Sequence, residues 1–347
     1  MESQNSVTDS FGDRNSELSM GLDAARYYLS KSVKNSTKQQ YDRVYDVWRN
    51  FCQRNELEEF GASHEQLAAC LSLVMMRDKS YSKVVMLSAA VTNEYRIRML
   101  PSPTTHETIS TLFRGFRNEH PQTRTAKLPI TEEILDKFYN HLYQTKHGRD
   151  GLRASVVLWR TIWRISMEYH TLGRISDIVK LRRSDVKYVT DPSPHLRILF
   201  KGGKNDLYTE GAERVVASNP TVKRCPVQLT LNYFKYLGTS YIGYLVPSCL
   251  AKNFPNPDKS VPYSGALADM KKLMDSLGYD GKLYGEHSGK RGGATTAAAH
   301  GATDKQLKRL GGWRSDAMPA KYVDLSIPSR LSMSELLQKN QNDTNTV

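Results

Sequence analysis

Apolar residues recur at intervals of three and four through the first third of this chain, and that spacing forms a continuous face only on a helix. In NSTKQQYDRVYDVWRNFCQRN, Ser36 and Gln39 make a capping box at the start of such a helix. Its apolar face would carry Tyr41, Val44, Tyr45, Trp48, Phe51 and Cys52. Similar patterns follow in HEQLAACLSLVMMRD, YSKVVMLSAAVTNEYRIRML and THETISTLFRGFRNE. Because such faces must be buried against one another, residues 21–125 are predicted to form an all-helical domain.

The rest of the chain mixes helical and strand patterns. HPQTRTAKLPIT is typical of an exposed linker, with the domain boundary near Ala126, and a helix capped by Thr131 follows it. LRASVVLWRTIWRISMEYHTLG has the apolar density of a buried helix, whereas VKYVT, HLRILF and ERVVAS have strand character. The predicted fold class is therefore mainly α with a small antiparallel β-sheet (α+β), the second domain spanning residues 126–335. The polar segments 1–20 and 336–347 are expected to be a flexible lead and a flexible tail.

The charge balance of the 347-residue chain favours a polyanionic partner. Lys and Arg total 49 against 36 Asp and Glu, a net charge of +13, which suits nucleic acid or a membrane surface. No stretch approaches the ~18 uninterrupted apolar residues of a membrane span, and the N-terminus lacks the apolar core of a signal peptide, so we expect a soluble intracellular protein. The cysteines form no CxxC pair and the histidines no HExxH pattern. Neither a metal site nor a disulfide framework is therefore predicted, and the thiols are expected to be free and buried.

The most informative segment is GEHSGKRGGATTAAAHGATDKQLKRLGGWRSDAMPAKYVD. Its order resembles the C-terminal signature of the tyrosine recombinases of the phage-integrase family: HxxR, an apolar helix, LGH or LGW, and then a Tyr nine residues after that His or Trp. His287 opens the motif, LGGW ends at Trp313, and Tyr322 lies nine residues beyond Trp313. The wording HSGKRGGATTAAA looks closest to the Crypton and DIRS-like recombinases of eukaryotic mobile elements.

Two upstream segments resemble the other half of the family's site. In YHTLGRISDIVKLRRSDV, Arg174 takes the place of the family's first Arg, with Asp177 as the accompanying acid. In KGGKNDLYTEGAERVVA, the family's hairpin Lys corresponds to Lys204, with Lys201 as the alternative. The resemblance covers residues 126–325, and STKQQYDRVYDVWRNFC looks like part of the family's core-binding domain.

The resemblance implies that the chain cleaves and rejoins DNA through a 3′-phosphotyrosyl intermediate. Tyr322 would be the nucleophile, and its phenol, with an unperturbed pKa of about 10, needs nearby cations or a base. Arg174 would hold the phosphate oxygens, and Lys204 would protonate the departing 5′ hydroxyl. His287 would accept the Tyr proton, and Trp313 would donate its indole hydrogen to the phosphate. Because the phosphotyrosine stores the bond energy, no cofactor is expected.

The chain departs from the family at the second Arg. The fourth position of HSGK holds Lys290, and Arg291 comes next, where successive helical residues point about 100° apart. A Lys keeps the charge but loses the bidentate fork, and losing one preorganised donor costs on the order of 10²–10³ in rate. Lys290 is predicted to lie in the site, with Asp177 and Arg291 as supporting residues. A backbone slip at Gly292 and Gly293 would let Arg291 replace Lys290.

The predicted partner is double-stranded DNA, and the resemblance implies a tetramer on two DNA sites, with no membrane or small-molecule substrate. Basic residues of the first domain that could either grip phosphates or form ordinary solvated faces are Lys83, Arg96, Arg98, Arg114, Arg117 and Arg124. The leading interpretation is a site-specific recombinase or integrase. The alternatives are a catalytically impaired, domesticated DNA-binding protein and a type IB topoisomerase. A nuclear location is expected if the source is eukaryotic, and a cytoplasmic one otherwise.

Overall fold

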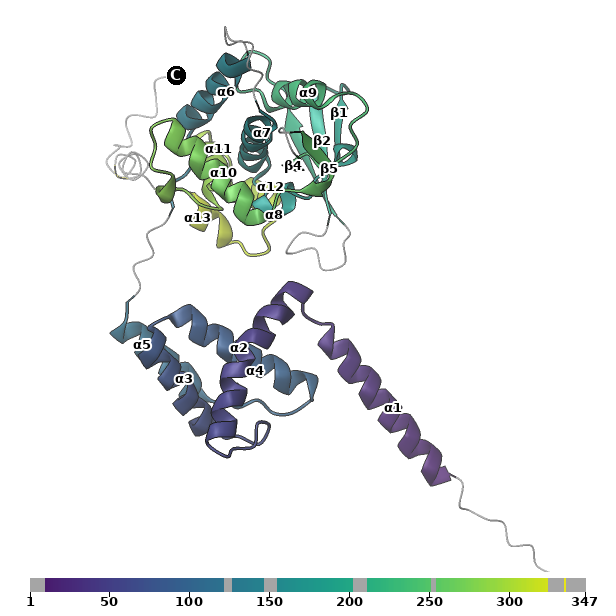
Figure 1. The fold of residues 1–347 in the computed structure, drawn as a ribbon, viewed down its shortest axis with the longest axis vertical. Helices are drawn as coiled ribbons and strands as arrows, with labels where there is room; N and C mark the ends of the chain where they lie inside the picture. The colour runs from purple at the N-terminus through teal and green to yellow at the C-terminus, as the bar shows by residue number, and fades with distance from the viewer. Residues whose placement is uncertain are drawn as a thin grey trace, which may run out of the picture. The chain divides into compact units, whose positions relative to one another are not determined.

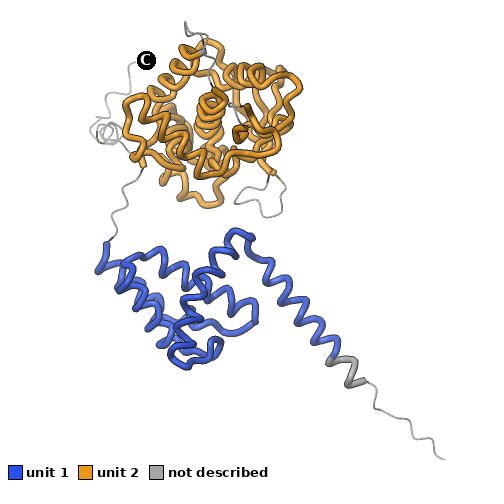
Figure 2. Tube along the Cα trace, in the orientation of Figure 1, with its two compact units in different colours: residues 1–124 blue, residues 125–347 orange. Residues whose placement is uncertain are grey.

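The chain divides into two compact units, unit 1 covering residues 1–124 and unit 2 residues 125–347 (Figures 1 and 2). The structure, a computed structural model, describes residues 10–121, 127–146, 155–201, 211–250, 254–323 and 334, with side chains from residue 16 onward except that of residue 146. Arg124, Ala126, Lys204 and the predicted tail at 336–347 lie outside the described residues.

Unit 1 is helical wherever its residues are described, apart from turns. Its helices are α1 (Ser10–Ser30), α2 (Asn35–Arg54), α3 (His64–Asp78), α4 (Tyr81–Ile97) and α5 (Glu107–Glu119), with a 3₁₀ turn at Pro103–Thr105. The predicted apolar face of α2 packs into the core of this unit, where Trp48 is fully buried. The predicted capping box of α2 is wrong, because the helix begins at Asn35 with Lys34 as its N-cap, so that Ser36 lies inside the first turn.

The predicted flexible lead also needs correction. Residues 10–20 belong to α1, which continues without interruption to Ser30. The described side chains of its first half are exposed, Leu18 and Met20 among them, so α1 has formed there without burying an apolar face. Near its C-terminal end α1 is tied to α4, since Arg96 donates a hydrogen bond to the hydroxyl of Ser32 just beyond the helix.

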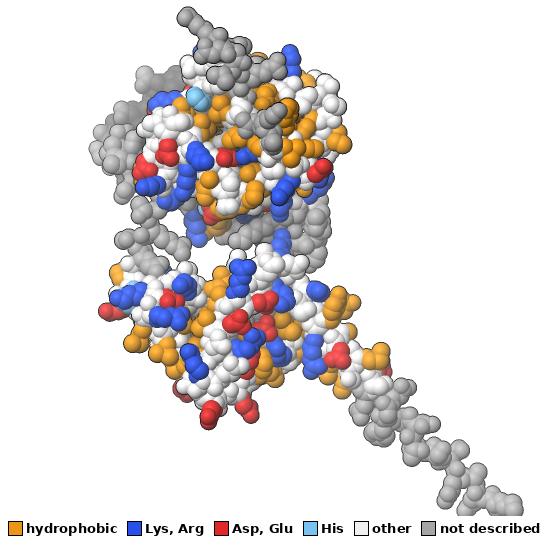
Figure 3. Space-filling view, in the orientation of Figure 1, with side chains coloured by type: hydrophobic (Ala, Val, Ile, Leu, Met, Phe, Trp, Pro, Cys, Tyr) orange, Lys and Arg blue, Asp and Glu red, His pale blue; other side chains and the backbone are white. Residues whose placement is uncertain are grey.

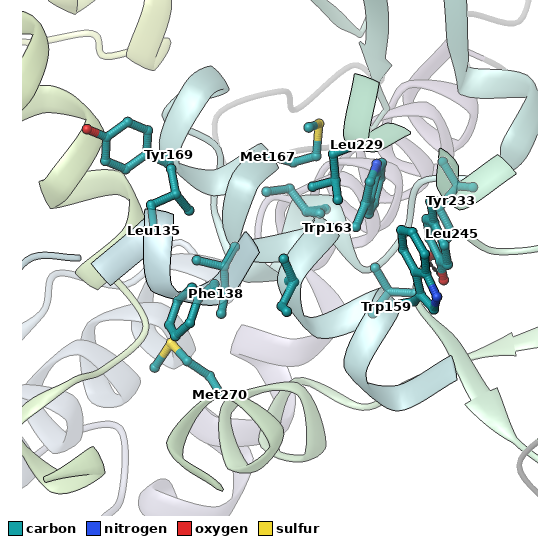
Figure 4. Close-up of a cluster of buried hydrophobic side chains, with 14 of the residues drawn as sticks. Leu135, Phe138, Trp159, Trp163, Met167, Tyr169, Leu229, Tyr233, Leu245 and Met270 are labelled. Atoms are coloured by element: carbon teal, nitrogen blue, oxygen red, sulfur yellow. Dashed lines mark hydrogen bonds between the residues drawn. The ribbon is translucent and has the colours of Figure 1, made fainter. Parts of the chain in front are cut away.

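Unit 2 is built around the buried helix that the sequence predicts. This helix, α7 (Val156–Thr171), lies in the middle of the unit, with α6 (Glu132–Lys146), α9 (Pro226–Leu237), α10 (Tyr263–Ser276) and α11 (Ser288–Ala299) packed against it (Figure 1). Trp159 and Trp163 of α7 lie beside Tyr233 of α9, and the Trp159 and Tyr233 rings stack 5.8 Å apart (Figure 4). Three short helices complete the described part, α8 (Ile175–Ile178), α12 (Asp304–Gly311) and α13 (Met318–Tyr322), with 3₁₀ turns at Arg183–Asp185 and Gly281–Leu283.

The three predicted strands form one antiparallel sheet in the order β1-β2-β3, namely Val186–Val189, His195–Phe200 and Ala212–Ala217. Inward residues of the sheet, such as Ile198 and Val216, join the core of unit 2. A second, two-stranded sheet of β4 (Pro247–Cys249) and β5 (Pro255–Ser260) was not predicted, because β5 contains two prolines and no β-branched residue.

Two glycines let α11 approach its neighbours closely. A Cβ on Gly292 would collide with the backbone carbonyl of Ile130, and one on Gly293 with that of Tyr169 in α7. α11 runs as one helix through Gly292 and Gly293. The hypothesis that these glycines allow a backbone slip, which would let Arg291 replace Lys290, is therefore wrong. Their role is close packing.

Within the described residues, no helix is both long and apolar enough to cross a membrane. In the same residues no three His, Cys, Asp or Glu side chains are grouped so that they could hold a metal ion. Cys52, Cys70 and Cys225 are free and buried, whereas Cys249 is free and exposed. The prediction of buried thiols is therefore wrong for Cys249, which lies in the short strand β4.

Candidate active site

The end of unit 2 brings Tyr322 against Trp313 and His287. The rings of Tyr322 and Trp313 stack with centroids 4.9 Å apart, and the ring of His287 meets Tyr322 edge-on at 5.6 Å. Trp313 is buried in a small apolar cluster with Leu172 and Leu307, and Tyr322 packs on its edge. The predicted register between Trp313 and Tyr322 therefore corresponds to direct contact.

The LGGW sequence explains why the indole can lie where it does. After α12, Gly312 adopts a left-handed conformation (φ 61°) that reverses the chain. A Cβ on Gly311 would lie 2.8 Å from the ring of Trp313, so only glycine lets the ring fold back on this turn. The buried indole N–H of Trp313 has no hydrogen-bond acceptor among the described residues. Buried donors without a partner are rare in native structures, so this N–H marks a position of interest in the site.

Lys290 lies beneath these aromatic rings. Its side chain is 1% exposed, and its Nζ donates to the carbonyl of Gly311 at 3.2 Å. The same Nζ lies 4.6 Å from the ring centroid of Trp313 and 5.1 Å from that of Tyr322. Burial, reinforced by the positive charge of Arg174, lowers the pKa of Lys290 to about 7. Arg291 points elsewhere, since its Nη1 donates to the backbone carbonyl of Lys127 at 3.0 Å.

Arg174 reaches the site from a different part of the chain. It is the N-cap residue of α8, and its Nη1 lies 3.6 Å from a carboxylate oxygen of Asp177, one helical turn on. Burial raises the pKa of the Tyr322 hydroxyl, and the positive charge of Arg174 opposes that rise. Arg174 is therefore near both Tyr322 and Lys290, as the family resemblance implies.

Sequence reasoning missed a further cation, Arg214 of β3. It is half-buried on the same side of the strand as Val216, and its guanidinium lies against the backbone of Gly312. Burial lowers the pKa of Arg214, with the charge of nearby Asp177 opposing and that of Arg174 adding to this effect. The sequence could have indicated Arg214, because it is an Arg on the inward side of an apolar strand and a charged group at such a position needs a partner.

The hairpin has two candidate lysines, and only one of them lies within the described residues. Lys204 lies outside them. Lys201, the alternative, donates from Nζ to a carboxylate oxygen of Asp185 at 2.6 Å, and its side chain is 58% exposed. This ion pair holds Lys201 at the end of β2.

A carboxylate accompanies His287. Nε2 of His287 lies 3.1 Å from one oxygen of Glu286, and the other oxygen of Glu286 accepts a hydrogen bond from the hydroxyl of Tyr263. The carboxylate contact fixes one ring nitrogen of His287 while its ring faces Tyr322.

The basic residues of unit 1 fall into two groups. Lys83 and Arg98 form ion pairs with Asp78 and Glu94, and Arg96 hydrogen-bonds to Asn93 and Ser32. Arg114 and Arg117 instead line a hollow of about 770 Å³, together with Tyr81 and Phe113. Basic and acidic side chains are interspersed on the face of unit 1 that Figure 3 shows.

No protein-family model matches the sequence, and no curated protein matches it. Solved structures do match. The integrase of the Tn1549 transposon, in complex with transposon right-end DNA, is similar with a TM-score of 0.54 and 16% identity over 92% of this chain and 99% of that chain. A lambda integrase dimer bound to a COC′ core site is similar with a TM-score of 0.52 and 15% identity, covering 88% of this chain and 95% of that one.

The XerH site-specific recombinase, bound to a palindromic difH substrate after cleavage, is similar with a TM-score of 0.52 and 14% identity over 80% of this chain and 71% of that chain. All three are tyrosine recombinases or integrases, as the sequence resemblance implies. The predicted fold class is confirmed: this chain has the tyrosine-recombinase fold, mainly helical with a small antiparallel sheet.

Proposed function

We propose that this chain is a site-specific DNA recombinase or integrase that cleaves and rejoins double-stranded DNA through a 3′-phosphotyrosyl bond. The observation that carries the proposal is the convergence of Arg174, His287, Lys290, Trp313 and Tyr322 in one part of unit 2. These residues come from distant stretches of the sequence. The three similar solved structures support the proposal, since they hold transposon DNA, a core site and a difH substrate.

The proposed step is an attack by the hydroxyl oxygen of Tyr322 on a backbone phosphorus atom. The new bond joins that oxygen to phosphorus, the bond to the 5′ oxygen of the next nucleotide breaks, and the 3′ linkage is kept. His287 takes the Tyr proton, and Lys204 gives a proton to the departing 5′ oxygen. Rejoining is the same step in reverse, with a 5′ hydroxyl attacking the phosphotyrosine, so ATP is not consumed.

Charge that develops on the phosphate oxygens needs donors already in place. Arg174 can supply a guanidinium, held toward the site by Asp177. The buried N–H of Trp313, which has no acceptor among the described residues, can donate to one oxygen. Lys290 holds the two aromatic rings in place from below, and Arg291 supports the fold at Lys127.

We further propose that unit 1 contributes phosphate contacts from Lys83, Arg96, Arg114, Arg117 and Arg124. Arg114 and Arg117, which share a hollow with aromatic side chains, are the best placed of these for a backbone phosphate. Binding should weaken steeply with salt, because phosphate neutralisation releases counterions. The acting species would be a tetramer on two DNA sites, nuclear if the source is eukaryotic and cytoplasmic otherwise. The likeness to Crypton and DIRS-like recombinases stays a prediction.

The proposal can be tested without knowing the target sequence, by selecting the duplexes that become covalently attached to the protein. The full chain is incubated with nicked duplexes that carry a randomised core, and adducts that survive denaturation are recovered and sequenced. A nick near the cleavage point lets the freed end diffuse away, so the adduct accumulates. We expect a recurrent sequence from the unaltered chain and no adduct from Tyr322→Phe.

The alternatives give different outcomes in the same experiment. Recovery of duplexes that are bound but never covalently joined would favour a domesticated DNA-binding protein, the interpretation motivated by Lys290. Adducts with no sequence preference, together with relaxation of supercoiled plasmids of any sequence, would favour a type IB topoisomerase. Either outcome contradicts site-specific recombination.

A further inference from the structure

The proposed cleavage places new charge on two non-bridging phosphate oxygens, and one guanidinium from the motif, that of Arg174, meets it. Lys290 occupies the position where a second Arg would be expected, but its Nζ is directed to the carbonyl of Gly311 and to two aromatic rings. With 1% of its surface exposed, Lys290 is poorly placed to reach a phosphate. A second planar donor must therefore come from another element.

Arg214 of β3 has the required position. It is close enough to Arg174, Asp177 and Lys290 for electrostatic interaction with each of them. Its guanidinium lies against Gly312, the residue before Trp313, close to where a Cβ on that residue would lie. The strand holds it in register, since Arg214 pairs with Ile198 across β2 and β3.

The charges around Asp177 also point to an anion. Arg174 forms an ion pair with this carboxylate, and the positive charge of Arg214 also interacts with it; both Arg side chains are partly exposed. Their mutual repulsion is only partly offset by Asp177, because one negative charge faces two positive ones. A phosphodiester, which carries one negative charge, would complete the balance and could accept two parallel hydrogen bonds from either guanidinium.

We infer that Arg214 is a catalytic residue of this chain, contacting the scissile phosphate together with Arg174 and supplying the guanidinium that Lys290 cannot. The inference rests on the proposed function and assigns the second donor to β3 in place of α11. It also explains how a chain with Lys290 in its motif can retain a site with two guanidinium groups. Arg291 is not needed for this role.

The first test measures single-turnover strand cleavage of the selected nicked duplex by the full chain. Arg214→Ala should slow cleavage by about 10²–10³, as expected for the loss of one preorganised donor, and Arg214→Lys should keep the charge but recover only part of the rate. The matched control is Arg197→Ala on β2, whose side chain is exposed and paired with Glu213 on the outer side of the sheet. That variant should cleave at the unaltered rate.

The second test separates contact with the phosphate from a structural role. A duplex with a methylphosphonate at the mapped cleavage position lacks one charged oxygen, so a guanidinium that neutralises that oxygen becomes dispensable there. The deficit of Arg214→Ala and of Arg214→Lys should shrink on this duplex, with thermal unfolding and duplex binding unchanged.

The inference is overturned if Arg214→Ala cleaves the ordinary duplex as fast as the unaltered chain, or if the deficit is the same on both duplexes. Should Arg214→Ala fail to fold, Arg214→Lys decides on the same two duplexes. If the unaltered chain forms no adduct at all, the proposed function itself fails and the inference fails with it. That outcome is distinct, because it appears before any variant is made.

Discussion

The two sides of the candidate site carry their positive charge in different ways. On the side formed by α8 and β3, Arg174 and Arg214 keep part of their surface exposed and lie near a carboxylate, Asp177. On the side formed by α11 and α13, Lys290 is buried under two aromatic rings and its pKa falls to about 7. We call these the charged side and the aromatic side.

This difference teaches that a basic residue in a motif does not by itself identify a phosphate ligand. What matters is whether the charged end has room and a countercharge. The partly exposed guanidinium groups of the charged side meet both conditions. Lys290 meets neither, and it is better suited to supporting Trp313 and Tyr322 on the aromatic side.

The largest effect is expected on the charged side. Arg174→Ala should slow strand cleavage by about 10²–10³ while the unit stays folded, because under the proposed function the lost group, which is paired with Asp177 outside the core, is a transition-state donor. Single-turnover cleavage on the selected duplex measures it. The control is Arg182→Ala, whose guanidinium stacks on Tyr244 at 4.2 Å. Equal losses in both variants would mean that general attraction to DNA, and not position, explains the effect.

A smaller effect, on the unfolding free energy of unit 2, is expected at Gly293, where α11 of the aromatic side packs against α7. Gly293→Ala should destabilise unit 2 by about 1–3 kcal/mol, since the added methyl collides with the carbonyl of Tyr169 and forces α11 away from α7. Chemical denaturation of the full chain measures this loss. Gly115→Ala on α5 is the matched control, because its Cβ would meet nothing within 4 Å. A stable Gly293→Ala variant would show that the two helices can separate without loss.

A further effect concerns the pH dependence that Lys290 causes. Its pKa is lowered from 10.5 to about 7 in the folded chain, so between these values the unfolded chain binds a proton that the folded chain has released. Stability should therefore rise with pH across this range, by at most about 1.4 kcal/mol per pH unit for one group. Lys290→Met should remove this contribution to the slope of the unfolding free energy. An unchanged slope would mean that Lys290 stays charged when buried.

Periodic features of the fold could be predicted because each depends on neighbouring residues. The apolar face of α2 follows from residue spacing, the buried helix α7 from its apolar density, and the three strands of the first sheet from their strand-forming residues. The two strands β4 and β5 could not be predicted, since β4 has only three residues and β5 contains two prolines. The helix at residues 10–20 was missed because polar composition favoured a flexible segment.

The candidate site was predictable only as far as the motifs extend. The resemblance to the family's motifs implied roles for Arg174, His287, Trp313 and Tyr322, and the structure brings these four residues together. Arg214 could not be found in this way, because a strand pattern shows which residues alternate but not which element lies opposite them. The burial of Lys290 depends on rings contributed by residues more than twenty positions later in the chain.

The most direct measurement locates the covalent bond itself. Adduct recovered from the nicked duplex is digested with nuclease and protease, and mass spectrometry identifies the peptide that keeps a nucleotide. We predict a single modified peptide, with the phosphate attached to the hydroxyl oxygen of Tyr322. Attachment at another residue, or an adduct that persists in Tyr322→Phe, would contradict the assignment of the nucleophile.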